Sequence, residues 1–150
     1  MSEQPNVRLK AWNDQAFCAN YGDEAVWMGG LRGFAAYRDL GVEEATGGQF
    51  RAHVVRVTKE AFDKHHTTGL HRHLCDFQFN YCLKGWIKFV YEGQEGEFTF
   101  KAGDSWLQPA GIVHNETSCS DDVEILEIYS PAVHETVAVE QTPAVPGLRS

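Results

Sequence analysis

Two stretches decide the fold of this chain: HRHLCDFQFNYCLKG at residues 71–85 and GDSWLQPAGIVH at residues 103–114. Between them, short runs of β-branched and aromatic residues alternate with glycine-containing turns: WIKFVY at 86–91, EGQEG at 92–96 and EFTFK at 97–101. Short strands at this spacing, with no helical pattern of about 10–15 residues between them, are typical of an antiparallel sandwich or barrel.

The strand pattern continues on both sides of these stretches. The run QFRAHVVRVT (49–58) alternates in polarity and is rich in β-branched residues, and VEILEIY (123–129) closes the series. We therefore predict an all-β protein, an antiparallel β-barrel or double-stranded jelly roll, as a single domain of residues 1–150 with core motifs at 50–131. The tail is predicted to be extended or disordered from about residue 138.

Composition limits the possible partners. The chain has 150 residues, 43% of them hydrophobic, which is ample for a core, and a net charge of −8. An acidic chain without a basic run is a poor ligand for nucleic acid, and no apolar stretch approaches the roughly 18–20 residues that span a bilayer. Because the N-terminus lacks the apolar core of a signal peptide and the four cysteines form no regular framework, we expect reduced thiols and a cytoplasmic location.

The histidine pair His71 and His73 is the first candidate for chemistry. Residues i and i+2 of a strand point to the same face, so the two imidazoles converge on one point and can share one ion with bonds near 2.1 Å. The remaining histidines are expected to be ordinary: His53 as a core or surface residue of its strand, His65 and His66 in a solvated loop, and His134 at the surface.

The two stretches resemble the paired motifs of the cupin superfamily, H-x-H-x4-E-x6-G and G-x5-P-x-G-x2-H-x3-N. The resemblance covers roughly residues 50–131 and implies a small jelly-roll barrel that holds a divalent metal inside. By position, the implied ligands are His71, His73, Gln78 and His114. The implied cofactor is a divalent transition metal: Fe, Mn, Ni, Zn or Co.

Three positions depart from the cupin pattern. His65 stands where the first motif opens with Gly, and Ser118 stands where the second closes with Asn. Gln78 replaces the usual Glu, and this change alters the chemistry because a neutral amide leaves the full charge on the ion and makes bound water more acidic. The alternative is that Gln78 marks a degraded site and serves only as a polar residue filling the barrel.

Strand alternation from Gln78 predicts which side chains face inward. Asn80 and Cys82 follow it into the interior, giving a polar lining that suits a ligand cavity. Cys75 and Cys82 are expected as buried small hydrophobes rather than ligands. Three aromatic residues face outward and favour a homodimer, as does the resemblance to small cupins: Phe77, Phe79 and Tyr81. Alternation leaves open whether Trp106 and Gln108, or Ser105 and Leu107, face inward.

The last strand carries two acidic residues on opposite faces, Glu124 and Glu127. One of them is expected to enter the barrel, where a carboxylate must pair with a cation or serve the site. The ending Glu127-Ile128-Tyr129-Ser130-Pro131 resembles that of small cupins that process unsaturated uronate monomers, which implies a catalytic Glu127 beside the aromatic Tyr129. The alternative is that both glutamates are surface residues of an edge strand.

Three functions remain open at this point. The first is a metal-dependent enzyme that acts on a small oxygenated molecule such as a sugar acid, by isomerase- or lyase-like proton transfer. The second is an Fe(II)-dependent cupin dioxygenase, which three histidines with an open coordination edge allow. The third is a non-catalytic sensor or binding module, because fold alone does not fix function.

Overall fold

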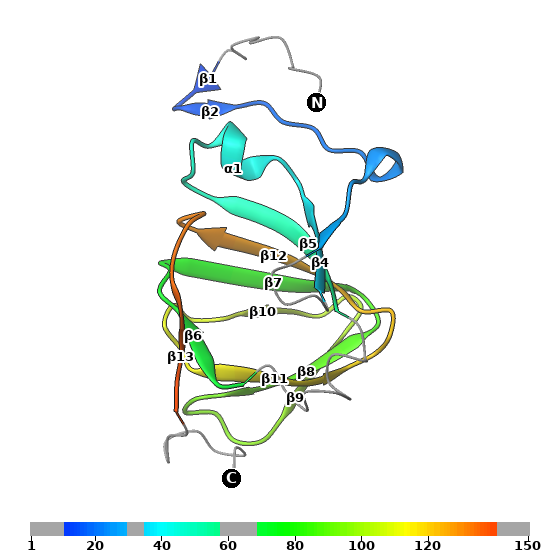
Figure 1. Ribbon diagram of the computed structural model, residues 1–150, viewed down its shortest axis with the longest axis vertical. Helices are drawn as coiled ribbons and strands as arrows, with labels where there is room; N and C mark the ends of the chain where they lie inside the picture. The colour runs from blue at the N-terminus through cyan, green and yellow to red at the C-terminus, as the bar shows by residue number, and fades with distance from the viewer. Residues whose placement is uncertain (1–10, 30–34, 58–68, 141–150) are drawn as a thin grey trace.

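Two antiparallel β-sheets facing each other form the body of the protein (Figure 1). The computed structural model describes residues 11–29, 35–57 and 69–140. The strands of the larger sheet are β3 (Met28–Gly29), β4 (Ala35–Asp39), β5 (Arg51–Val57), β7 (Phe77–Lys84), β10 (Ser105–Leu107) and β12 (Glu124–Ser130). Those of the smaller sheet are β6 (His71–His73), β8 (Trp86–Tyr91), β9 (Phe98–Lys101), β11 (His114–Cys119) and β13 (Thr136–Ala138).

The order of the strands explains how distant segments meet. The six-stranded sheet runs β10-β7-β12-β5-β4-β3, and the five-stranded sheet runs β13-β6-β11-β8-β9. Neighbours in the sheets pair antiparallel, and consecutive strands often change sheet, as in a jelly roll. The predicted all-β fold is confirmed, and the predicted strands at 49–58, 86–91, 97–101 and 123–129 all form with small shifts at their ends.

The hydrophobic core lies between the two sheets and towards one end of the sandwich. Its buried members come from both layers: Val55, Val57, Cys82, Ile87, Phe89, Tyr91, Trp106, Cys119, Val123 and Ile125. Phe100 stacks on Trp106 with ring centroids 3.8 Å apart, which joins the sheet edges at β9 and β10. Polar side chains are buried in the same interior, among them Gln78, Gln108 and His114.

The N-terminal third, which lies outside the cupin motifs, extends the larger sheet. Strand β4 pairs with β5, and β3 pairs with β4, so this segment forms one edge of the sheet. The only α-helix in the described residues is the single turn α1 (Val42–Ala45), and a 3-10 turn lies at η1 (Gly22–Glu24). The small hairpin of β1 (Ala11–Trp12) and β2 (Gln15–Ala16) lies beyond α1 at the end of the molecule (Figure 1).

A motif glycine turns the chain between β7 and β8. Gly85 adopts a φ of 69°, in the left-handed region that side chains with a Cβ disfavour. A Cβ at this position would also meet the Ser120 hydroxyl, the Asp122 carboxylate and the Val123 backbone. The turn therefore requires glycine for both its conformation and its close packing.

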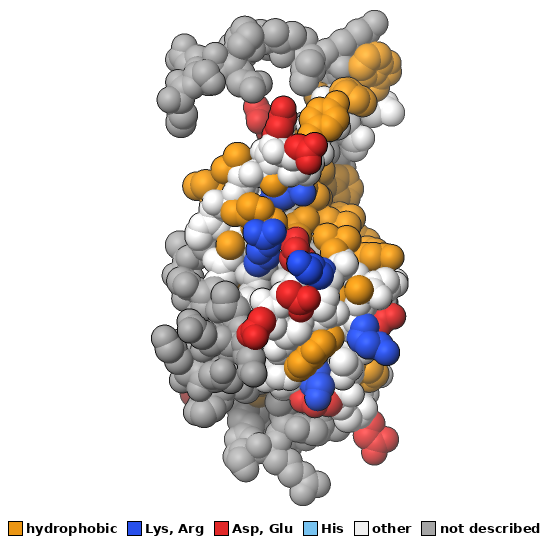
Figure 2. Space-filling view, turned by 90° about the vertical axis from the view of Figure 1, so that its right-hand side faces the viewer, with side chains coloured by type: hydrophobic (Ala, Val, Ile, Leu, Met, Phe, Trp, Pro, Cys, Tyr) orange, Lys and Arg blue, Asp and Glu red, His pale blue; other side chains and the backbone are white. Residues whose placement is uncertain are grey.

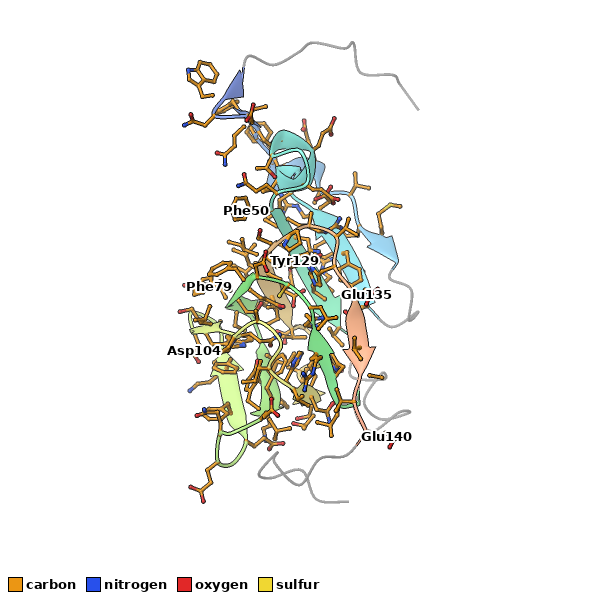
Figure 3. The ribbon with its side chains drawn as sticks, turned by 90° about the vertical axis from the view of Figure 1, so that its left-hand side faces the viewer. Phe50, Phe79, Asp104, Tyr129, Glu135 and Glu140 are labelled. Atoms are coloured by element: carbon orange, nitrogen blue, oxygen red, sulfur yellow. The ribbon has the colours of Figure 1, made fainter. Side chains whose placement is uncertain are left out.

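Alternation in β7 is as predicted. Gln78, Asn80 and Cys82 are buried, whereas Phe77 and Tyr81 are exposed. Figure 3 shows Phe79 of the same strand at the outer edge of the molecule, and Figure 2 shows acidic and basic side chains interspersed with hydrophobic ones on another face.

The structure also settles the orientation of β10 and places the end of the described chain. Trp106 and Gln108 are buried, whereas Leu107 is exposed, so the first pair faces inward. Strand β13 ends at Ala138, where the predicted tail begins, and the residues beyond 140 lie outside the described part. None of the described helices is long and apolar enough to cross a membrane.

Candidate metal centre

Three histidines from two neighbouring strands converge between the sheets. His71 and His73 alternate onto one face of β6, and His114 of β11 lies directly opposite His71 in the ladder. One nitrogen from each ring lies within 4.8 Å of those of the other two. His71 and His114 are buried and His73 is half-buried. The strand pairing thus assembles the cluster that the spacing predicted.

Polar contacts of the Nδ1 atoms fix the orientation of the three imidazole rings. His71 Nδ1 donates to the Gly69 carbonyl at 2.7 Å, and His114 Nδ1 donates to the Ile112 carbonyl at 3.0 Å. His73 Nδ1 lies 2.8 Å from the Thr136 hydroxyl of β13, the strand in the C-terminal tail. With Nδ1 protonated, the lone pair of a neutral ring sits on Nε2, the arrangement typical of metal-binding histidines.

The environment keeps His114 neutral. Burial, followed by the positive charge of His71, lowers the pKa of His114 from 6.5 to about 3, and His73 adds to the effect. A neutral imidazole is the form that binds a metal. At neutral pH the most deeply placed ring of the cluster is therefore ready to act as a ligand.

The amide of Gln78 has a defined orientation beside the cluster. Its Nε2 lies 3.3 Å from Glu127 Oε2, to which it donates. Its Oε1 accepts from Gln108 Nε2 at 3.3 Å, and that same Gln108 nitrogen lies 3.4 Å from His114 Nε2. The amide oxygen thus shares the Gln108 donor with His114, while the amide nitrogen faces the Glu127 carboxylate. An amide oxygen has two lone pairs, so accepting from Gln108 leaves one for another partner.

Gln108 is held by a hydrogen-bond chain that crosses the core. Trp106 Nε1 donates to the Tyr91 hydroxyl at 2.8 Å, and this hydroxyl donates to Gln108 Oε1 at 2.7 Å. With its oxygen occupied, the Gln108 amide must turn its nitrogen towards Gln78 and His114. Sequence reasoning left the direction of Gln108 open, because the parity of so short a strand gives no signal.

Glu127 is the acidic residue of β12 that turns inward. It stands between His53 of β5 and Asn80 of β7 in the sheet, and its Oε1 lies 2.7 Å from His53 Nε2. Glu124, three residues earlier, pairs with Arg56 at 3.7 Å, and the Arg56 side chain is half exposed. The question that the sequence left open is answered, because Glu127 faces the interior and Glu124 does not.

Two opposing effects act on the Glu127 carboxyl. Burial raises its pKa. The hydrogen bond from His53 and the electrostatic effects of His53, His73 and His71 lower the pKa by a larger amount. The net pKa lies below its ordinary value. Glu127 is therefore ionised at neutral pH, and His53 Nε2 at 2.7 Å is its closest polar partner.

A cavity of about 730 Å³ opens onto this group, within the size range of small-molecule sites. His71, His73, Gln78, Glu127 and Tyr129 all line it. The Tyr129 ring packs edge-on against His53, with centroids 5.3 Å apart. The metal ligands and catalytic residues proposed from the sequence therefore share one space, except His114, which lies behind the others.

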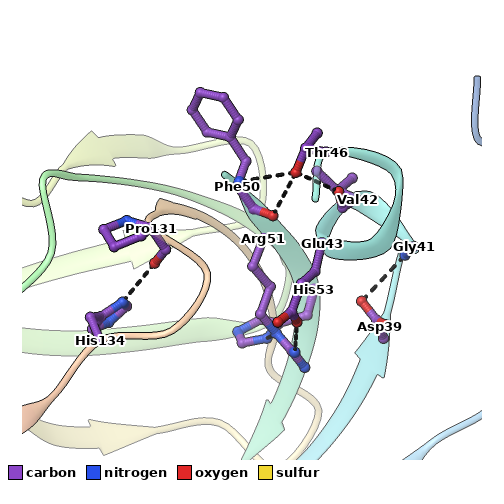
Figure 4. Close-up of polar contacts among 10 residues, drawn as sticks. All are labelled: Asp39, Gly41, Val42, Glu43, Thr46, Phe50, Arg51, His53, Pro131 and His134. Atoms are coloured by element: carbon purple, nitrogen blue, oxygen red, sulfur yellow. Dashed lines mark hydrogen bonds and ion pairs between the residues drawn. The ribbon is translucent and has the colours of Figure 1, made fainter. Parts of the chain in front are cut away.

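Sequence reasoning missed a histidine at this cavity. His134 was expected at the surface but is half-buried, lines the cavity and lies 5.8 Å from His73 between ring centroids. Its Nδ1 donates to the Pro131 carbonyl at 2.9 Å (Figure 4). No periodicity marks a residue in a loop after the last long strand, so the sequence held no signal for it. His65 and His66 lie outside the described residues.

The cysteines behave as predicted. Cys75, Cys82 and Cys119 are buried and Cys18 is exposed, and all four are free thiols. Burial raises the pKa of the Cys75 and Cys82 thiols. These two side chains act as small hydrophobes, outside the group of histidines that faces the cavity.

Comparison with known proteins agrees with this architecture. Residues 59–129 match the family model of the cupin domain. The structure of KdgF from a Halomonas species has a TM-score of 0.60 at 18% identity, covering 75% of this chain and 94% of that one. An RmlC-like cupin from Shewanella frigidimarina has a TM-score of 0.60 at 19% identity, covering 79% and 95%.

A larger protein also shares the fold. A structure of oxalate decarboxylase from Bacillus subtilis, a study of its Mn(II) centres, has a TM-score of 0.53 at 17% identity. The match covers 71% of this chain and 28% of that one. A comparison with curated protein sequences found no match.

Proposed function

This chain belongs to the cupin superfamily, and we propose that it is a metal-dependent enzyme that transfers a proton on a small oxygenated molecule such as a sugar acid. One observation carries the proposal. The ionised carboxylate of Glu127 and two histidines of the cluster, His71 and His73, line the same cavity, from opposite sheets. A base next to a site for a Lewis acid is the arrangement that abstraction of a proton beside a carbonyl requires.

The residues present fit a divalent transition metal. Imidazole nitrogens suit Fe, Mn, Ni, Zn and Co, and three of them lie within 4.8 Å of one another, so small ring rotations bring all three onto one ion. Gln78 would add a neutral oxygen, because its amide oxygen accepts from the same Gln108 nitrogen that lies 3.4 Å from His114 Nε2. When bound, the ion supplies a positive centre that polarises a substrate oxygen.

The two oxygens of Glu127 are held differently. Oε1 lies 2.7 Å from His53 Nε2, whereas the hydrogen bond of Oε2 within the described residues is the longer one of 3.3 Å from the Gln78 amide. The less tightly held Oε2 is the one that takes the substrate proton. Tyr129 follows two residues later on the same face of β12, so its ring borders the place where the substrate lies.

Deuterium exchange tests this proposal without knowledge of the final product. Protein loaded with each candidate metal is incubated in D2O with a panel of keto and unsaturated sugar acids, and NMR follows deuterium entering the substrate. We expect exchange with the wild type, a loss of about 10²-fold or more in Glu127→Gln, and near wild-type exchange in Glu124→Gln. Both changes remove one carboxylate from β12, but only the first removes it from the cavity.

Two results would overturn the proposal. Exchange at the wild-type rate in Glu127→Gln would exclude this carboxylate as the base. Oxygen consumption that depends on Fe(II) and on substrate, without any deuterium exchange, would favour the dioxygenase alternative. Metal content and unfolding curves of both variants show that the fold and the metal site are intact.

A further inference from the structure

Beside Glu127, two residues of β5 that also line the cavity, Arg51 and His53, form a chain of polar contacts with it. Arg51 Nε lies 3.1 Å from His53 Nδ1, and His53 Nε2 lies 2.7 Å from Glu127 Oε1. Arg51 is itself fixed by a 2.7 Å ion pair between its Nη1 and Glu43 of α1 (Figure 4). This places a guanidinium, an imidazole and a carboxylate in a row.

The chemistry of the first contact determines the position of a hydrogen atom. Arginine stays protonated and has only donors, so its Nε–H must donate to His53 Nδ1, which must accept with its lone pair. A neutral imidazole with an unprotonated Nδ1 carries its hydrogen on Nε2. His53 therefore donates from Nε2 to Glu127 Oε1 at 2.7 Å.

Packing holds the imidazole in this line. His53 is 4% exposed, and its ring lies between Tyr37, at 5.1 Å, and Tyr129, at 5.3 Å, both measured between ring centroids. Strand pairing sets His53 directly opposite Glu127. A buried ring with aromatic neighbours and partners on both nitrogens has little freedom to turn.

We propose that Arg51 and His53 are positioning residues, in which Arg51 fixes the tautomer of His53 so that His53 acts as a permanent donor to Glu127. This inference rests on the proposed function, because it gives the base its orientation: Oε1 is tied back and Oε2 is turned to the cavity. His53 has no lone pair directed at Glu127, so it does not relieve Glu127 of an acquired proton. That proton leaves Oε2 only towards the substrate or water in the cavity.

Ring nitrogen NMR tests the tautomer directly. The full chain is labelled with 15N in its histidine rings, and long-range 1H–15N spectra report which nitrogen of His53 carries hydrogen. We expect the Nε2–H tautomer in the wild type. Glu127→Gln should keep it, because the Arg51 donor remains, whereas the double variant Arg51→Met with Glu127→Gln should show both tautomers.

A matched control removes the ion pair but keeps the donor. Glu43→Gln should leave the tautomer of His53 unchanged, because Arg51 Nε still reaches Nδ1. The proposal is overturned if wild-type His53 carries hydrogen on Nδ1, or if the double variant keeps the same single tautomer as Glu127→Gln. Deuterium exchange measures the proposed function, whereas ring nitrogen shifts measure the tautomer of His53. Failure of one proposal is therefore distinguishable from failure of the other.

Discussion

Acid should destabilise the metal-free protein through His114, and the size of the effect follows from its surroundings. Burial beside His71 lowers the pKa of His114 from 6.5 to about 3. Between these values the unfolded chain binds a proton that the folded chain refuses, so the free energy of unfolding falls as pH falls through this window. At about 1.4 kcal/mol per pH unit, the loss from this residue reaches about 2 kcal/mol at pH 5.

Urea unfolding of the wild type and His114→Asn at pH 7 and pH 5, with chelator present, measures this loss. The asparagine amide keeps a donor for the Ile112 carbonyl but does not titrate. Between pH 7 and pH 5 the free energy of unfolding of His114→Asn should therefore fall by about 2 kcal/mol less than that of the wild type. Val113→Ala, which shrinks a fully buried neighbour, serves as a control that lowers stability without altering proton binding. Equal losses in the wild type and His114→Asn would refute the reasoning.

Three further predictions concern the metal shell, a turn and the assembly. Gln78→Glu adds a negative charge beside the histidines and should tighten Zn²⁺ binding by about tenfold or more in a chelator competition; weaker binding would contradict this. In urea unfolding, Gly85→Ala should lower the free energy of unfolding by at least about 1 kcal/mol more than Gly93→Ala does. Gly93 shares the positive φ of Gly85 but has open space around it. Equal decreases in the two variants would contradict the role of close packing at Gly85. The chain should sediment at micromolar concentration with twice its mass of 16.8 kDa, and Tyr81→Lys on the outer face of β7 should weaken this homodimer; a wild-type monomer would exclude it.

Much of the metal centre can be read from the sequence because its geometry is local. The alternation of His71 and His73 is a property of any strand, and the cupin spacing is enough to place His114 with them. The alternation of β7 likewise gave the burial of Gln78 and Asn80. These predictions needed only strand periodicity and the motif.

The parts that could not be predicted depend on how distant strands register. The contact between His53 and Glu127 joins residues 74 positions apart, and a shift of one residue between β5 and β12 would send one of them to the opposite face. For the same reason strand alternation did not distinguish Glu124 from Glu127, and only the resemblance to small cupins favoured Glu127. His134 reaches the cavity from a loop, where no periodicity indicates direction.

Three histidines should together hold one divalent metal, and the metal content per chain measures this. Wild-type protein, His71→Ala and His134→Ala are each loaded with Zn²⁺, passed through a desalting column and analysed by mass spectrometry for bound metal. Both variants remove a cavity histidine, but only His71 belongs to the cluster. We expect one equivalent in the wild type and His134→Ala and almost none in His71→Ala. Equal metal in His71→Ala and the wild type, or none in the wild type, would contradict it.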